Sequence, residues 1–179
     1  MNNDLIKTTP IGTSEFCWLT EPDMAFNKND GKGEYQCSVS FTKAEGVEHK
    51  KAINDAIAKL IADIHKKTPG VKDLKRSTLP YREEGDKITF KFKSKFKPRL
   101  YDRDAKELGA DISVWKGSTM KVRYKLNPYN LPIGVGCTLY LQDVQIVNLI
   151  KGSSQNGASP FKKIEGMAVE SKLPAKELY

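Results

Sequence analysis

Hydrophobic and polar side chains alternate along two segments in the second half of the chain, and this alternation predicts two amphipathic strands. Residues 87–97 carry apolar side chains at even positions and lysines at odd ones: Ile88, Phe90, Phe92 and Phe96 against Lys91, Lys93, Lys95 and Lys97. Residues 120–126 repeat the pattern with Met120, Val122, Tyr124 and Leu126 against Lys121, Arg123 and Lys125. Because side chains alternate across a strand, each segment has a core face, which includes Tyr124, and a cationic face.

Shorter apolar runs bounded by turn residues predict further strands at residues 14–20, 34–41 and 112–115, and residues 99–101 are expected to continue the first amphipathic strand beyond a bend at Pro98. The last strand, residues 134–150, has its apolar face on odd positions up to Leu141 and on even positions from Val144. Such a switch of face inside one strand indicates a β-bulge near Gln142-Asp143.

Three segments between the strands are predicted to differ from them. From Val47 the apolar period changes to about 3.6, which predicts a helix over about residues 46–67, with His49 and His65 on its polar side. Residues 70–86 are predicted to form a loop that ends in a Gly85-Asp86 turn, and residues 127–132 a proline-bracketed loop that displays Tyr129.

The composition indicates one globular domain and a tail. A chain of 179 residues with 39% hydrophobic residues is long enough to bury a core without disulfides or metals. Residues 152–179 begin with a Gly/Ser/Asn/Pro-rich stretch typical of linkers, so we expect a single domain over residues 1–151 and a flexible tail that ends at Tyr179.

The cysteines and the apolar runs point to the cytoplasm. Cys17, Cys37 and Cys137 each lie in an apolar run, which favours reduced core thiols over a disulfide or zinc framework. No apolar run approaches the ~20 residues of a membrane span, and the polar start does not resemble a signal peptide. We expect no membrane contact, no metal and no cofactor.

Positive charge is concentrated in the two amphipathic strands and the segment between them. Residues 87–125 contain 12 basic and 4 acidic side chains, an excess that equals the net charge of +8 of the whole chain. Localised positive charge on a sheet face is typical of a binding site for a polyanion. The acids between Asp102 and Asp111 alternate with bases and lack a calcium-loop spacing, so they predict a charged hairpin tip rather than a nuclease centre. We therefore expect no enzyme activity.

Five or six strands with one helix inserted after the second predict a mainly β fold, an OB-fold-like antiparallel Greek-key barrel. Nucleic-acid sites on such barrels combine a basic groove for phosphates with aromatic side chains on which bases stack. The candidate site comprises Trp115 and Tyr129 as stacking residues and, as cations, Lys32, Lys91, Lys93, Lys95, Lys97, Arg99, Lys121, Arg123 and Lys125.

A series of short motifs resembles one protein family. Its members are the single-stranded DNA-binding proteins of short-tailed bacteriophages, and the matching segments are Gly12-Thr13-Ser14-Glu15, Pro22-Asp23, Gly33-Glu34-Tyr35, Thr89-Phe90-Lys91-Phe92-Lys93, Lys121-Val122-Arg123-Tyr124, Pro128-Tyr129 and Gly134-Val135-Gly136. The resemblance implies an OB fold and non-sequence-specific binding to single-stranded DNA during phage replication, recombination and repair. It also implies a possible homodimer, contacts with the phage polymerase and helicase/primase, and a DNA-binding surface at the Phe-Lys-Phe-Lys strand and Tyr129.

The tail departs from the pattern of this family. Members typically end in a strongly acidic tail with a terminal aromatic residue, whereas residues 152–179 here carry four lysines and three glutamates. Tyr179 keeps the aromatic end, and the acidic charge is missing. The residues alone leave two other interpretations open, an RNA-binding OB protein and a protein-interaction or virion-assembly module.

Overall fold

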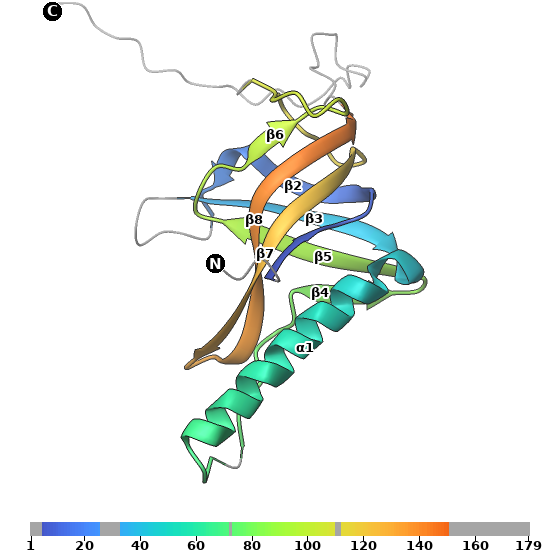
Figure 1. Cartoon of the computed structure of the whole chain (residues 1–179). Coiled ribbons are helices and arrows are strands. Elements are labelled where there is room, and N and C mark those ends of the chain that lie inside the picture. Colours follow the sequence, from blue (N-terminus) through green and yellow to red (C-terminus); the bar gives the residue numbers. More distant parts are fainter. Residues whose placement is uncertain (1–4, 26–32, 72, 110–111, 151–179) are drawn as a thin grey trace, which may run out of the picture.

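A computed structural model describes residues 5–25, 33–71, 73–109 and 112–150 of the chain (Figure 1). The expected tail, including Tyr179, and the loop residue Lys32 lie outside the described residues.

The described chain folds into a strand-rich barrel with one helix. The elements in chain order are β1 (Ile6–Thr8), β2 (Gly12–Asp23), β3 (Glu34–Thr42), α1 (Lys43–Lys67), β4 (Tyr81–Glu84), β5 (Lys87–Ser94), β6 (Arg99–Tyr101), β7 (Thr119–Leu131) and β8 (Gly134–Asn148).

The barrel closes because β2 pairs with strands on both of its sides. The strands follow the order β2-β3-β5-β8-β7, and β7 returns to β2 through the pairs Gly12–Met120 and Thr13–Thr119. All pairings in the ring are antiparallel except the parallel pairing of β5 with β8. Strand β6, which follows β5 in the chain, also pairs in parallel with β8, further along that strand. This is the predicted OB-type barrel, with its helix between the second and third ring strands.

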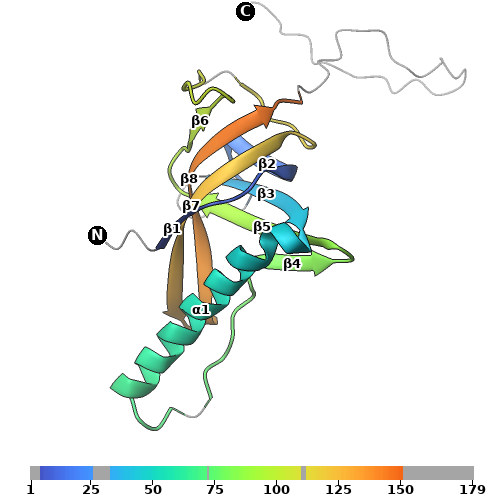
Figure 2. The same cartoon turned by 45° about the vertical axis from the view of Figure 1, so that its right-hand side comes forward.

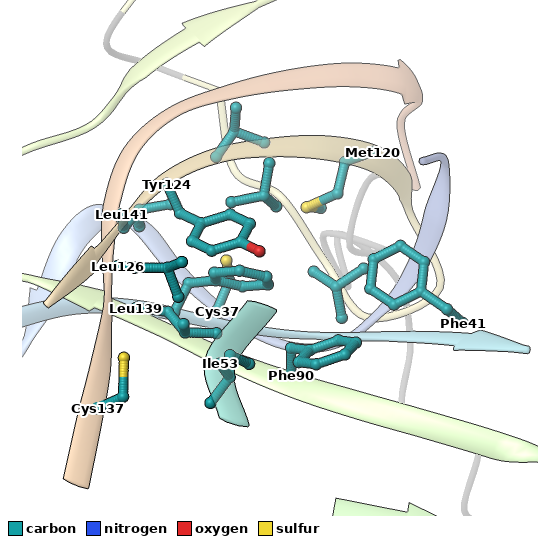
Figure 3. Close-up of a cluster of buried hydrophobic side chains, with 14 of the residues drawn as sticks. Cys37, Phe41, Ile53, Phe90, Met120, Tyr124, Leu126, Cys137, Leu139 and Leu141 are labelled. Carbon is teal, nitrogen blue, oxygen red and sulfur yellow. The ribbon is translucent and has the colours of Figure 1, made fainter. Parts of the chain in front are cut away.

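The core contains the apolar face that the alternation predicted. Phe90, Phe92 and Tyr124 are almost fully buried, and Ile53 of α1 joins the strand residues of the same cluster (Figure 3). The prediction was wrong for Phe96, which is 83% exposed. β5 ends at Ser94, so the alternation no longer directs side chains at position 96.

Two of the register shifts in the sheet, both β-bulges, decide which side chains in the middle of β8 and β2 face outward. Arg123 pairs with Asp143 and Tyr124 with Leu141, so Gln142 is the extra residue of β8 and the predicted bulge is confirmed. A second bulge lies in β2, where Ser14 pairs with Val39 and the next pair is Phe16–Ser38. This bulge was not predicted. Beyond this bulge, Cys17 and Leu19 face inward, whereas Phe16 and Trp18 face solvent.

Helix α1 confirms the predicted helix and corrects its buried stripe. Thr42 and Glu45 form a capping box at its start, and the helix packs on β3, β5, β7 and β8 before it runs beside the β7–β8 hairpin (Figure 2). Val47, predicted in the apolar stripe, is 60% exposed. His49, predicted at the surface, is buried instead, and its Nδ1 lies 2.7 Å from the hydroxyl of Tyr124. The helical phase is therefore set by Ile53 and Ile57, which share the buried face with His49.

Three local predictions were wrong. The predicted loop at 70–86 contains β4, which pairs with β5 through the predicted Gly85 turn, where φ is +55°. The predicted strand at 112–115 is an irregular segment. The predicted loop around Tyr129 is the end of β7, because β7 and β8 continue as a long hairpin as far as the Leu131–Gly134 pair. No helix in the described residues is long and apolar enough to cross a membrane.

The buried pair of His49 and Tyr124 predicts a pH-dependent stability. Burial lowers the pKa of His49 below its ordinary value of about 6.5, although Glu48 partly opposes this and Lys7 adds to it. The unfolded chain then binds a proton more readily than the folded protein. The free energy of unfolding should be highest above the ordinary pKa and should fall as the pH drops below it.

Denaturant unfolding at pH 5 and pH 7.5 tests this expectation. His49→Gln should lose the part of the pH dependence that wild type shows between these values. His65→Gln is the matched control, because His65 is exposed on the same helix. An equal pH dependence in wild type and His49→Gln would contradict the assignment.

Candidate nucleic-acid interface

The outer side of β2, β3 and β5 carries aromatic residues beside lysines. Across these strands Phe16 pairs with Ser38 and Ser38 with Lys91, while Trp18 pairs with Gln36 and Gln36 with Lys93. Phe16 and Trp18 are 43% and 39% exposed, and their rings meet edge to face with 6.3 Å between centroids. We call this surface, together with Trp115, the aromatic face.

Trp115 joins the aromatic face from the segment that precedes β7. The backbone carbonyl of Trp115 accepts a hydrogen bond from the hydroxyl of Ser14 at 3.0 Å, and the amide of Gly117 donates to the carbonyl of Ser14 at 2.9 Å. The two segments enclose a groove of about 670 Å³, whose lining includes Phe16, Trp18, Trp115 and Lys116. Both tryptophans of the chain therefore line one groove.

Strand β3 separates Phe16 and Trp18 of β2, the aromatic column, from Lys91 and Lys93 of β5, the lysine column, and two of its residues make polar contacts. Gln36 is buried, and its amide nitrogen donates to Asp23 at 2.6 Å. Nζ of Lys93 lies 3.4 Å from a carboxylate oxygen of Glu34 in a partly exposed ion pair. The row that contains Trp18 is thus held at its centre by the Gln36–Asp23 hydrogen bond.

The other predicted cations lie on a second surface, the outer side of β5, β6, β8 and β7. Three rows cross it, with a residue of β8 at the centre of each: Lys93–Tyr140–Lys125, Arg99–Asp143–Arg123 and Tyr101–Gln145–Lys121. We call this surface the cationic face. Lys93 ends one row of each surface, so the aromatic face and the cationic face meet at β5.

Asp143 holds two of these cations together. Its side chain is 12% exposed and accepts a hydrogen bond from Nε of Arg99 at 2.9 Å and one from Nη1 of Arg123 at 3.1 Å. The arginine side chains are 59% and 48% exposed. The bulge at Gln142 makes this contact possible, because it turns Asp143 to the outer side between the two arginines.

A groove of about 580 Å³ lies beside the first row of the cationic face. Its lining includes Lys93, Lys95, Phe96, Lys97, Lys125 and Tyr140. Four of the predicted cations are therefore brought together with two exposed aromatic residues, neither of which was among the predicted site residues. Lys91 lies apart from this group on the aromatic face.

Tyr129 does not share either surface. It is half-buried at the end of β7, pairs with Gly136, and its hydroxyl lies 2.8 Å from the Ser77 hydroxyl. A Cβ at Gly136 would lie 2.6 Å from the Tyr129 hydroxyl, so the ring lies directly over this glycine. The side chain braces the β7–β8 hairpin against residues 75–77, and its stacking role remains a prediction.

The described residues offer little for metal or thiol chemistry. No group of three or more His, Cys, Asp or Glu side chains within them is placed to hold a metal ion. Asp102 instead accepts backbone hydrogen bonds from Asp104 and Lys106 at 2.8 and 2.9 Å, as expected for the predicted hairpin tip. Burial raises the pKa of Cys17 and Cys137 to about 11 and that of Cys37 well above its ordinary value, so these thiols stay protonated at neutral pH.

The sequence of the chain matches the model of a known protein family. The family model described as the single-stranded DNA-binding protein of bacteriophage T7 matches residues 11–151. The chain belongs to this family. The match confirms the resemblance seen in the sequence and the prediction that the protein binds single-stranded DNA. No curated protein sequence matches the chain.

Solved structures of phage single-stranded DNA-binding proteins share the fold. The gp2.5 protein of bacteriophage T7 is 21% identical with a TM-score of 0.67, over 86% of this chain and 97% of that one. The protein of bacteriophage Enc34, solved in complex with single-stranded DNA, is 10% identical with a TM-score of 0.63, over 83% of this chain and 89% of that one. These likenesses confirm the predicted OB-type fold.

Sequence reasoning missed four aromatic residues that this phage-type barrel exposes, namely Phe16, Trp18, Phe96 and Tyr140. Phe16 and Trp18 were noted only as part of an apolar strand, because the bulge at Glu15 left no signal in the alternation. Tyr140 is 45% exposed within a strand that is otherwise rich in buried residues. The available signal was its even position in a run whose odd positions, Leu139 and Leu141, are apolar and buried.

The placement of Tyr129 predicts a structural effect. Tyr129→Phe and Ser77→Ala should each lower the free energy of unfolding by about 1 kcal/mol, the usual contribution of one such hydrogen bond. Their double variant should lose clearly less than the sum of the two, because both remove the same contact. Denaturant unfolding of the four proteins measures this cycle. Additive losses would show that the hydroxyl pair does not stabilise the hairpin.

Proposed function

We propose that the protein binds single-stranded DNA on the aromatic face. Bases stack on Phe16, Trp18 and Trp115, and phosphates lie near Lys91, Lys93 and Lys116. The observation that carries this proposal is the groove between β2 and residues 113–116, which both tryptophans line on the face that carries Lys91 and Lys93 two strands away, across β3. An aromatic platform beside cations is what binding to single strands requires.

Sequence tolerance follows from the chemistry of this surface. Stacking uses the ring face that every base has, and lysine attracts every phosphate alike. Neither contact distinguishes one base from another, so the proposed binding is independent of sequence.

We further propose that the protein acts without catalysis in replication, recombination and repair of phage DNA, in the cytoplasm of the host. Membership of the phage family supports this role. A homodimer also remains a proposal that family resemblance motivates. So do contacts of the tail, which ends at Tyr179, with polymerase and helicase/primase.

Tryptophan fluorescence tests the location of the site. An oligo-dT should quench the emission of Trp18→Phe and of Trp115→Phe, because each variant keeps one tryptophan in the groove. Trp18→Ala should weaken binding by about 1 to 3 kcal/mol, the range for stacking of one base. Val47→Ala, which truncates an exposed apolar residue on α1, should bind like wild type. If neither single-tryptophan variant responds to DNA, the site lies elsewhere.

Competition between matched DNA and RNA oligonucleotides tests the ligand class. Because the proposed contacts go to bases and phosphates, we expect RNA to compete measurably, with DNA the stronger ligand. Stronger competition by RNA would overturn the assignment to DNA.

A further inference from the structure

We propose that a longer single strand continues from the aromatic face around the barrel onto the cationic face, where a base stacks on Tyr140 and phosphates contact Lys125, Arg99 and Arg123. This inference rests on the proposed function of the aromatic face. It extends the binding site by a second segment with its own stacking residue and its own cations.

The first argument is continuity. One row of outer side chains crosses all five ring strands as Trp18, Gln36, Lys93, Tyr140 and Lys125, in the registers of the four successive strand pairs. Neighbouring strands lie about 4.8 Å apart, so the row spans roughly 19 Å, which is enough for several nucleotides. Aromatic residues and lysines alternate along it, apart from the buried Gln36. For a DNA strand that contacts Trp18 and Lys93, the next aromatic ring along the row is Tyr140 and the next cation is Lys125.

The second argument is the accessibility of the contacts. Tyr140 is 45% exposed, and it lines the groove of about 580 Å³ together with Lys93, Lys95, Lys97 and Lys125. An exposed tyrosine ring surrounded by four lysines matches the chemistry of a stacked base with phosphates on either side. An acidic peptide would use the lysines but would gain little from the ring.

The third argument concerns the arginines. Each guanidinium has five N–H donors and makes a single hydrogen bond to Asp143, from Nε of Arg99 and from Nη1 of Arg123. Asp143 is buried beneath two arginines that are about half exposed, so the pair presents positive charge to solvent. We assign Asp143 as a positioning residue that fixes two phosphate-binding groups in advance, which lowers the entropic cost of binding.

Binding of oligo-dT of increasing length tests this path. Lengths from about 4 to about 16 nucleotides cover the range of OB-fold site sizes. Wild-type affinity should rise in two stages. Tyr140→Ala should leave binding of the shortest oligonucleotides unaffected and weaken binding of the longer ones by roughly 5- to 160-fold, the range of one stacking contact. Lys125→Gln should lower the salt slope by about 0.7, again for the longer oligonucleotides only.

Two further variants sharpen the test. Arg123→Gln should behave like Lys125→Gln and show whether the second row takes part. Lys59→Gln, which removes one exposed charge on α1, is the matched control and should leave the length dependence unchanged. All variants are compared by circular dichroism for folding, and Tyr140→Ala and Lys125→Gln do not touch the Asp143 contacts.

The outcomes separate this inference from the proposed function. If Tyr140→Ala and Lys125→Gln bind every length like wild type, the cationic face is not part of the DNA path, while the aromatic face is unaffected. If they weaken all lengths equally, the cationic face is the first site rather than an extension, and the inference is wrong in that form. Failure of the aromatic face itself appears separately, as short oligonucleotides that bind Trp18→Ala like wild type.

Discussion

Closure of the barrel is the constraint on which the rest of the structure depends. Once β7 returns to β2, one side of every ring strand is committed to a single core, and only the outer side remains for binding. Phe90 of β5 and Tyr124 of β7 occupy the inner side. The basic residues that alternate with the buried residues along these two strands therefore face outward. The charge distribution of the surface is therefore a consequence of how the core is filled.

The two bulges adjust this surface without disturbing the core. The bulge at Glu15 turns Phe16 and Trp18 to solvent while Leu19 stays buried, and the bulge at Gln142 turns Asp143 between two arginines. Each inserts one residue, and each lies beside a group of side chains that we assign to nucleic-acid binding. Bulges that redirect side chains near functional sites are common in β-proteins. Here they place an aromatic face and a cationic face on adjoining sides of one barrel.

Sequence periodicity was sufficient for the barrel, the helix and the bulge in β8, because each leaves a signal among neighbouring residues. Periodicity gave the wrong environment for residues whose position depends on contacts with segments distant in the sequence. His49 looked polar along the helix, but the helix is rotated so that His49 reaches Tyr124 of β7. Tyr129 looked like a loop residue between prolines, yet pairing with Gly136 and the contact with Ser77 extend the strand past it. The predicted cations within the described residues lie on the outside of the barrel, as expected, but their division between two faces depends on strand order, which alternation does not contain.

The burial of Gln36 is consistent with the proposal that this surface binds DNA without regard to base sequence. A glutamine side chain in a DNA site can pair with an adenine edge through its amide, and Gln36 stands between the aromatic column and the lysine column. Its amide nitrogen already donates to Asp23, and only 2% of the residue is exposed. The one long amide side chain on this part of β3 is thus withdrawn from the bases. The proposed contacts there come from aromatic rings and ammonium groups, which bind by stacking and charge and do not distinguish one base from another.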